Sequence, residues 1–164
     1  MVNMYRILIE GSIYSILFLV ILLTSLAYNP RIWLQDYPKD IQRMAKPKGK
    51  TEERQFLLIG SVVMLLTLAP LLSSIVLDGA QITFWSTFIQ FYLIFTMVSL
   101  SDLIILDWFI FCIITPSFII IPGTQGARGY KNFRFHFTGF LKGAIIYGAF
   151  SLILAGIRIA VTYI

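Results

Sequence analysis

The stretch TFWSTFIQFYLIFTMVSLSDLIILDWFIFCIITPSFIII, residues 83–121, decides how this sequence folds. It is the longest apolar run of the chain, and Asp102 and Asp107 are its only charged residues. A carboxylate at the centre of a membrane-spanning helix costs roughly 2.5–3.5 kcal/mol on insertion scales. Two aspartates in this run therefore indicate either the edge of the bilayer or a functional site.

The whole chain has the composition of a membrane protein. Of its 164 residues, 58% are hydrophobic and 13% are charged, whereas soluble domains contain about 25% charged residues. We therefore expect an all-α integral membrane protein with a single polytopic domain, residues 1–164. The one cysteine, Cys112, excludes an internal disulfide. A signal peptide cleaved near Ala27 is the alternative interpretation of the first apolar segment.

Four stretches are long enough to cross a bilayer as helices, because a hydrocarbon core of about 30 Å needs about 20 residues. Residues 83–121 are too long for one straight span, since they would form a helix of about 58 Å. If they crossed twice, almost nothing would remain for a turn. Length alone therefore leaves four and five spans open. The four predicted spans are residues 7–28, 56–77, 83–106 and 139–162.

The distribution of basic residues favours four spans. Eleven of the 13 Lys and Arg residues lie within or beside residues 29–55 and 122–138. The positive-inside rule places both segments in the cytoplasm, which requires an odd number of crossings between Thr83 and Ile121. We then expect both termini outside, Asp102 and Asp107 at the cytoplasmic mouth, and a short re-entrant or interfacial segment before the last span. With five spans, residues 123–138 would be external.

The segment after the first span predicts an amphipathic interfacial helix. Its apolar residues recur at helical spacing, so the opposite, basic face would contact anionic headgroups at the cytoplasmic face of the membrane. Asp36 and Asp40 lie one turn apart and can face the two aspartates of the third span, although Pro38 weakens a continuous helix. The apolar positions are Trp33, Tyr37, Ile41 and Met44.

The segment before the last span combines aromatic and basic residues. Residues 132–138 alternate Phe with polar side chains, which predicts an extended segment lying on the bilayer. His136, the only histidine, can act as an acid or base near neutral pH, so Asp107 and His136 are the candidate catalytic residues. One histidine does not make a zinc site, and we expect neither a metal nor a cofactor. Arg128, Lys131, Arg134 and His136 can together hold a phosphate or carboxylate, or simply fix the topology.

Two features concern helix packing. Glu10 and Arg158 lie at matching depths in the first and last spans, which predicts a structural ion pair, with Arg6 as the competing partner of Glu10. A stripe of small residues on the last span predicts close helix approach, either within the chain or in a homo-oligomer. The stripe comprises Ala144, Gly148, Gly156 and Ala160.

These features predict a small binding or transport-type membrane protein, expected in the plasma membrane of a prokaryote. Its cytoplasmic side would receive an ion, a small metabolite or a lipid headgroup. The alternatives are a membrane-embedded enzyme using Asp and His acid–base chemistry on a lipid-like substrate, and an accessory subunit of a membrane complex. Membrane sidedness explains the basic charge, so nucleic acid is not an expected partner. The predicted ligand-binding residues are Asp36, Asp40, Asp102, Asp107, Arg128, Lys131, Arg134 and His136.

Overall fold

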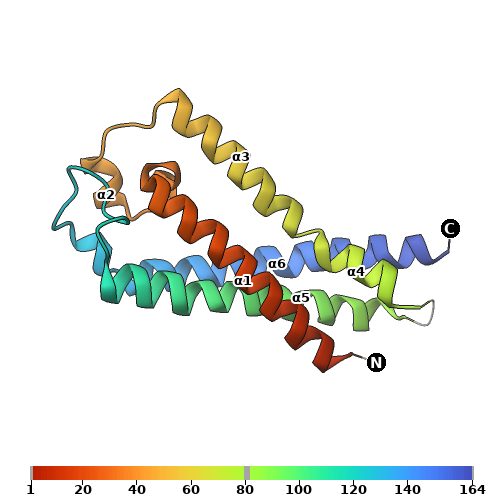
Figure 1. Ribbon diagram of the computed structural model, residues 1–164. Helices are drawn as coiled ribbons and strands as arrows, with labels where there is room; N and C mark the ends of the chain where they lie inside the picture. The colour runs from red at the N-terminus through yellow and green to blue at the C-terminus, as the bar shows by residue number, and fades with distance from the viewer. Residues whose placement is uncertain (1, 80–81, 164) are drawn as a thin grey trace.

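Four long helical segments run along one another in the structure (Figure 1). The structure is a computed structural model and describes residues 2–79 and 82–163. Each of the four segments is long and apolar enough to cross a membrane, and the described ranges contain no strand. The all-α membrane architecture predicted from the sequence is therefore confirmed. The segments are Met4–Tyr28, Lys50–Leu77, Phe84–Ile114 and Phe133–Thr162.

The first two spans begin and end where local chemistry requires it. Helix α1 (Met4–Tyr28) begins after Asn3, whose side chain accepts a hydrogen bond from the backbone N–H of Arg6 at 3.1 Å. The second span consists of α3 (Lys50–Leu66) and α4 (Ala69–Leu77). These helices are separate because Pro70, near the start of α4, has no N–H to continue the ladder of α3.

The third span is longer than predicted. Helix α5 (Phe84–Ser101) continues directly into a π-helical segment, η2 (Asp102–Ile114). Residues 108–114 therefore belong to the span, and the prediction of a re-entrant or interfacial segment there is wrong. The helix ends at Thr115, which has a left-handed conformation with φ of 50°, because Pro116 disfavours helical geometry in the residue before it.

The last span, α6 (Phe133–Thr162), also begins earlier than predicted. The side chain of Asn132 accepts a hydrogen bond from the backbone N–H of Phe135 at 3.0 Å and caps the helix. The predicted extended segment over residues 132–138 is therefore wrong. A helix surrounded by lipid can carry aromatic rings around most of its circumference, so alternation of Phe does not identify a strand here.

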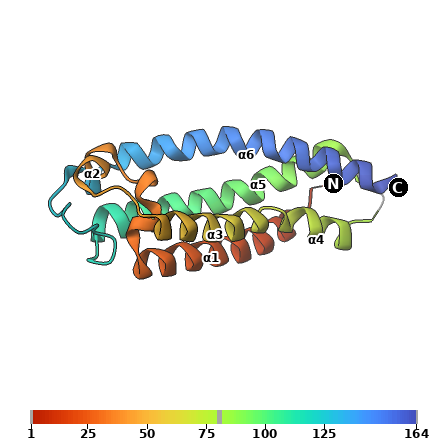
Figure 2. The same ribbon diagram turned by 90° about the horizontal axis from the view of Figure 1, so that it is seen from above.

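The two basic loops lie at the same end of the helical bundle, opposite the N- and C-termini (Figures 1 and 2). We call the end that holds residues 29–49 and 115–132 the basic end, and the opposite end the terminal end. Within the basic end, the backbone N–H of Gly129 donates to the Asp40 carboxylate at 2.7 Å and joins the two loops. This arrangement agrees with four spans and contradicts the five-span alternative.

The helix predicted after the first span is broken into two short helices, η1 (Pro30–Asp36) and α2 (Lys39–Met44). Tyr37 and Pro38 separate them, as the proline indicated. Tyr37 and Ile41 are fully buried, and they pack with residues of η2 and the second basic loop. The centre of the apolar face, Tyr37 and Ile41, therefore contacts protein, whereas Met44 at its end is exposed. The second loop carries the short helix η3 (Arg128–Lys131) before α6.

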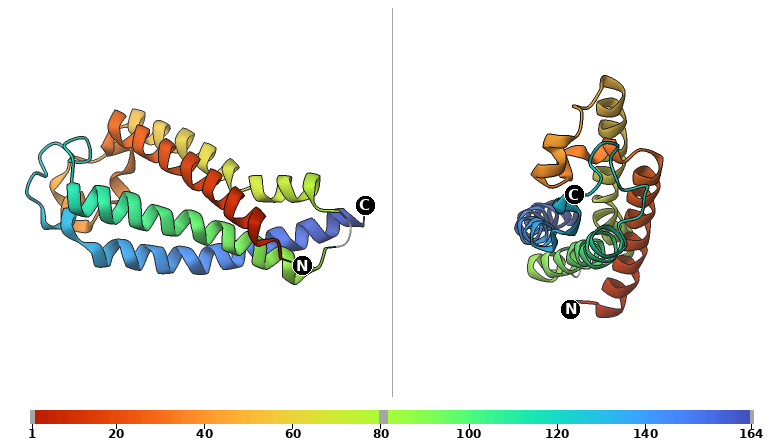
Figure 3. Two further views of the ribbon diagram at one scale, coloured as in Figure 1. Left: turned by 60° about the horizontal axis from the view of Figure 1, so that its bottom comes forward. Right: turned by 90° about the vertical axis from the view of Figure 1, so that its left-hand side faces the viewer.

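Helix α3 diverges from the paired helices α5 and α6 toward the basic end and runs roughly parallel to α1 (Figure 1). In the views of Figures 1 and 3, α1 crosses the paired helices α5 and α6, while α3 leans away from that pair. Helix α3 contains no buried residue, whereas α4 buries Pro70, Leu71 and Ser74 and contacts both α5 and α6. The bundle is therefore closed by α4 at the terminal end and more open beside α3.

The small-residue stripe of α6 has surroundings of two kinds. A Cβ atom added to Gly148 would lie 3.7 Å from the ring of Tyr92 on α5, so this glycine packs within the chain. A Cβ atom added to Gly156 would meet nothing within 4 Å. Internal packing therefore accounts for part of the stripe, and the homo-oligomer stays a prediction.

Candidate functional site

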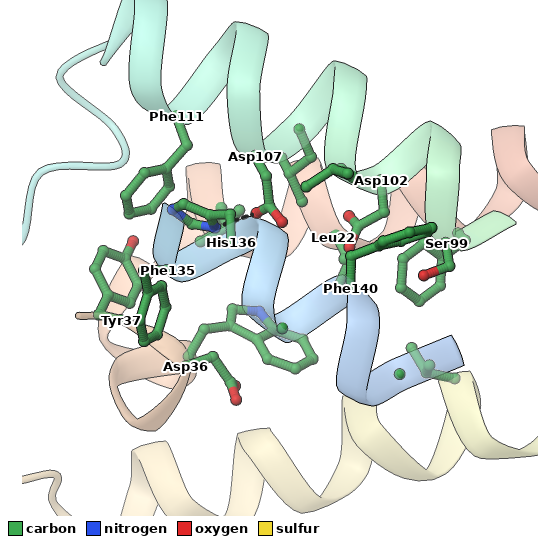
Figure 4. A pocket seen from close by; sticks show the side chains of 18 of the residues that line it. Leu22, Asp36, Tyr37, Ser99, Asp102, Asp107, Phe111, Phe135, His136 and Phe140 are labelled. Atoms are coloured by element: carbon green, nitrogen blue, oxygen red, sulfur yellow. Dashed lines mark ion pairs between the residues drawn. The ribbon is translucent and has the colours of Figure 1, made fainter. Parts of the chain in front are cut away.

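A pocket of about 520 Å³ lies at the basic end between α1, α3, η2 and α6, with η1 along its rim (Figure 4). Its walls are mostly apolar, and its polar side chains come from η1, α5, η2 and α6. Such a concave site with a few polar groups is typical of small-molecule binding. The polar side chains are Gln35, Asp36, Tyr37, Ser99, Asp102, Asp107, His136 and Tyr147.

Asp107 and His136 form an ion pair across the pocket wall. The Nδ1 atom of His136 lies 2.8 Å from the Oδ1 atom of Asp107, and His136 is only 7% exposed (Figure 4). The two residues meet because η2 extends the third span alongside the first turn of α6. A carboxylate bonded to Nδ1 fixes the orientation of the imidazole ring, as in many acid–base sites.

The second ring nitrogen of His136 is enclosed. Its Nε2 atom is buried and has no hydrogen-bond partner among the described residues. The imidazole ring packs edge-on against Phe111 and Phe135, with ring centroids 4.9 and 5.3 Å apart. The contact with Asp107 joins η2 to α6, whereas Nε2 makes no hydrogen bond with the described residues.

Asp102 carries the unsatisfied carboxylate of the pocket. Its Oδ1 atom is buried and has no hydrogen-bond partner within the described part of the chain. Asp102 lies at the junction of α5 and η2, beside Ser99 and Phe140 in the close view (Figure 4). Because burying a carboxylate oxygen without a partner is costly, we expect a proton, a water molecule or a ligand to complete this position.

The rim of the pocket holds one more carboxylate. The side-chain amide of Gln35 donates to Asp36 at 2.7 Å. Partial desolvation raises the pKa of Asp36, while the Gln35 amide and the Lys48 ammonium act in the opposite direction. Burial also raises the pKa of the neighbouring Tyr37 hydroxyl, which keeps this hydroxyl protonated. The hydroxyl donates a hydrogen bond to the backbone oxygen of Ile119 at 2.9 Å. Tyr37 is therefore a neutral structural donor, and Asp36 is the acidic group at the mouth.

A second, much smaller apolar crevice borders the pocket on the side of the terminal end. Its volume is about 40 Å³, and it lies between α1, the second span, α5 and α6. Phe18, Val63 and Tyr147 border both the pocket and the crevice. The site thus has a polar part at the basic end and an apolar part within the spans. The other crevice residues are Tyr14, Leu66, Thr67, Pro70, Phe95 and Val98.

Four of the predicted site residues lie outside the pocket. Asp40 is engaged by Gly129, as described above. The ammonium group of Lys131 lies 2.7 Å from the carbonyl oxygen of Cys112, within reach of the free carbonyls that end η2. Arg128 and Arg134 are exposed. Arg134 lies two residues from His136 on α6, so the two side chains leave different faces of the helix.

The predicted pair of Glu10 and Arg158 is wrong. At the terminal end, Glu10 is paired with Arg6, because residues four apart on a helix are neighbours and Asp78 approaches Arg6 from α4. Arg158 donates instead to the Ser74 hydroxyl at 3.0 Å and to the carbonyl oxygen of Asp78 at 2.9 Å. Arg6, the alternative partner of Glu10 in the sequence analysis, is therefore the partner observed in the structure.

The sequence analysis did not predict that aromatic residues and glycines of α6 line the pocket. Its residues recur at intervals of three and four, which places them on one face of a helix. The signal was present, but it becomes visible only if the segment around His136 is taken as helical. The pocket face of α6 comprises His136, Gly139, Phe140, Gly143 and Tyr147.

No protein-family model and no curated protein matches the sequence, and no solved structure matches the fold. Among the described residues, no three His, Cys, Asp or Glu side chains are grouped so that they could hold a metal ion. The function of the protein therefore has to be inferred from the shape and chemistry of the pocket.

Proposed function

We propose that this protein binds an amphiphile, a molecule with a polar head and an apolar chain, in the pocket at its basic end. The observation that carries the proposal is the pocket of about 520 Å³, which has carboxylates and an imidazole on its wall and borders a smaller apolar crevice within the spans. An amphiphile has the same division of polarity along its length. Its head would contact Asp102 and the pair of Asp107 and His136, and its chain would follow Phe18 and Val63.

The same pocket supports entry from the side. Among the described lining residues, Val63 alone comes from α3, and α3 itself buries no residue. A helix with few buried contacts moves at low cost, so the part of α3 around Val63 can separate further from α6 while Glu52 at the start of α3 stays paired with Arg31. An amphiphile dissolved in the bilayer would then reach the pocket laterally. This route favours a binding or transport-type protein.

The orientation follows from the positive-inside rule. The basic end carries both basic loops, so we place it in the cytoplasm of a prokaryotic cell whose plasma membrane holds the protein. The exposed Arg128 and Arg134 would contact anionic headgroups of the inner leaflet. The pocket then faces the inner leaflet, where its ligand enters or leaves.

The test measures binding of dodecyl amphiphiles to the protein in lipid nanodiscs. Trp33 lines the pocket, so in a Trp85→Phe, Trp108→Phe background its fluorescence reports contact with a bromine atom placed beside the amphiphile head. We expect saturable quenching by at least one of three probes, with trimethylammonium, uncharged tert-butyl or sulfate heads. Quenching that rises linearly for all three, as simple partition into lipid does, would refute the proposal.

Two glycines provide a matched pair of variants for this test. A Cβ atom added to Gly139 or to Gly60 would meet nothing within 4 Å, but only Gly139 lines the pocket. Gly139→Leu should fill part of the pocket and weaken binding by about tenfold, which corresponds to about 1.4 kcal/mol. Gly60→Leu should leave binding unchanged. Equal effects of the two substitutions would show that the probes bind elsewhere.

The contact between Asp107 and His136 favours a second candidate, acid–base catalysis on the bound amphiphile. A carboxylate that orients an imidazole is a common arrangement for proton transfer. Mass spectrometry of nanodisc lipids before and after incubation tests this candidate directly. Catalysis predicts a new lipid product that His136→Asn abolishes while quenching of Trp33 persists. Binding without any product supports the first candidate.

A further inference from the structure

The charge of the pocket is opposite to the charge of the surface around it. The described residues that line the pocket include three aspartates and no Lys or Arg. Lys131 is held at the end of η2, and Arg128 and Arg134 are exposed outside the pocket. Lys48 contacts Gln35 and the backbone oxygen of Ile32 at the rim and lies over the ring of Phe56, but it does not line the pocket. The pocket is therefore acidic within a basic end.

The two deeper aspartates differ in their capacity to bind a cation. Asp107 already contacts His136 at 2.8 Å, so part of its hydrogen-bonding capacity is used within the chain. Asp102 has no such partner among the described residues, and its buried Oδ1 atom accepts no hydrogen bond from them. Asp102 is thus the deeper carboxylate that no described side chain neutralises, and because the residue as a whole is half-buried and lines the pocket, it is the one available to contact a cation.

The walls beside Asp102 suit an organic cation. Phe140 and Tyr147 of α6 line the pocket with Asp102, and Phe140 lies close to it in Figure 4. Aromatic faces attract ammonium groups through the negative charge of the ring face, and a carboxylate beside them adds direct attraction. A metal ion would need several oxygen or nitrogen ligands, which the described residues do not group together here.

We infer that the head of the bound amphiphile is an organic ammonium group and that Asp102 is its anionic contact. This inference rests on the proposed function, because it names the class of amphiphile that the same pocket takes. The phenyl ring of Phe140 and the ring of Tyr147 cover the cation from the α6 side. Asp36 attracts the cation at the mouth, and the pair of Asp107 and His136 forms the wall toward η2.

The three bromine-bearing probes test the inference in nanodiscs. The trimethylammonium and tert-butyl heads have nearly the same shape and differ in charge, so their comparison isolates the charge. We expect the ammonium probe to bind at least about tenfold more tightly than the tert-butyl probe, and the sulfate probe to show no saturable binding. A fourth probe with an unmethylated ammonium head shows whether Asp102 prefers a hydrogen-bond donor or a methylated cation.

Variants at Asp102 complete the test. Asp102→Asn should lower affinity for the trimethylammonium probe by about tenfold and leave the tert-butyl probe unchanged, which also shows that the variant is folded. Asp102→Glu should keep the preference for the cation. Glu53→Gln, which removes the same charge from the exposed start of α3, should change neither probe.

The outcomes separate the two proposals. Equal binding of the charged and uncharged probes, or an equal loss of both in Asp102→Asn, would overturn the ammonium inference and leave amphiphile binding intact. Saturable binding of the sulfate probe alone would likewise overturn it. If none of the probes binds saturably, the proposed function itself fails and the inference fails with it.

Discussion

The two ends of the bundle both bury charged side chains, but at the terminal end every one of them has a salt-bridge or hydrogen-bond partner within the described chain. Arg6 contacts Glu10 and also Asp78, and the Ser73 hydroxyl donates to Glu10 at 3.1 Å. Arg158 is satisfied by a hydroxyl and by backbone carbonyls. At the basic end, by contrast, Asp102 keeps a buried oxygen atom without a partner among the described residues.

This difference separates a structural use of charge from a binding use. The terminal cluster contains two arginines and two acids, and it joins α1, α4 and α6 where the bundle is closed. The pocket at the basic end has excess negative charge and enough space for a ligand. Charge within a membrane is expensive in both places. At one end the chain supplies the compensation, and at the other end we propose that a ligand does.

The largest expected effect is an all-or-none difference in accessibility between the two ends. Cysteines introduced by Arg128→Cys and Tyr163→Cys lie in exposed positions at the basic and terminal ends, respectively. In a Cys112→Ala background, a membrane-impermeant maleimide should label position 128 only from the cytoplasmic side and position 163 only from the outside. Labelling is measured on oriented cells and on inverted vesicles.

A second cysteine at the basic end serves as the control for this labelling. Lys46→Cys lies on the first basic loop and should follow Arg128→Cys on every preparation, because Asp40 and Gly129 join the two loops. Labelling of positions 46 and 128 from opposite sides would break the comparison between the two ends, since the shared pocket would no longer exist.

The next largest effect concerns the paired charges of the terminal end. Arg6→Met leaves Glu10 and Asp78 without their common partner, and we expect the free energy of unfolding to fall by about 3–5 kcal/mol. Unfolding in mixed detergent micelles, followed by circular dichroism, measures this change. Arg54→Met makes the same substitution at an exposed position of α3, where we expect a change within about 0.5 kcal/mol.

A double-mutant cycle decides whether Arg6 acts through Glu10. If the two side chains form one unit, Arg6→Met and Glu10→Gln together should cost clearly less than the sum of the single substitutions. Additive costs, or an Arg6→Met variant as stable as the parent, would show that the terminal cluster is not the structural clamp described here.

Most of the fold follows from the sequence because hydrophobic length and charge sidedness are global quantities. Four spans need only about 20 apolar residues each, and the common side of the two basic loops needs only a count of Lys and Arg. The boundaries of the helices are harder to predict from the sequence, because different local patterns favour different secondary structures there. The alternating Phe residues predict an extended segment around His136 where the structure has a helix, and the apolar residues that follow Asp107 predict a separate segment where the structure continues the third span.

Only half of the candidate site could be predicted from the sequence, because the approximate position of a residue along a span is easier to predict than its contacts. Asp36, Asp102, Asp107 and His136 line one pocket, as their placement at one predicted boundary suggested. The basic members of the predicted site do not, because the sequence cannot show that Lys131 is occupied by the end of η2. Partner choice within the terminal cluster was also hidden, since it depends on where α4 ends beside α1.

A moderate effect is expected at the contact between the two basic loops. A Cβ atom at position 129 would lie 2.8 Å from the Cβ atom of Pro38 and even closer to the Asp40 carboxylate. Gly129→Ala should therefore lower the free energy of unfolding by about 1–3 kcal/mol. Gly60→Ala on α3 has open space and should raise it by up to about 1 kcal/mol. A neutral Gly129→Ala would show that the loops do not depend on this contact.

The smallest expected effect is the change in the free energy of unfolding on replacing Asp102 by Asn. The same substitution of Asp78 at the terminal end is the comparison. Asp78→Asn weakens a charged hydrogen bond with Arg6, so it should lower the free energy of unfolding by about 1–3 kcal/mol. Asp102→Asn removes a charge that no described side chain pairs, so it should change that free energy by less than about 1 kcal/mol or raise it. Both values come from the same detergent unfolding experiment. A loss at Asp102 as large as the loss at Asp78 would mean that this carboxylate also holds the fold together, and a binding role would no longer explain why it is retained.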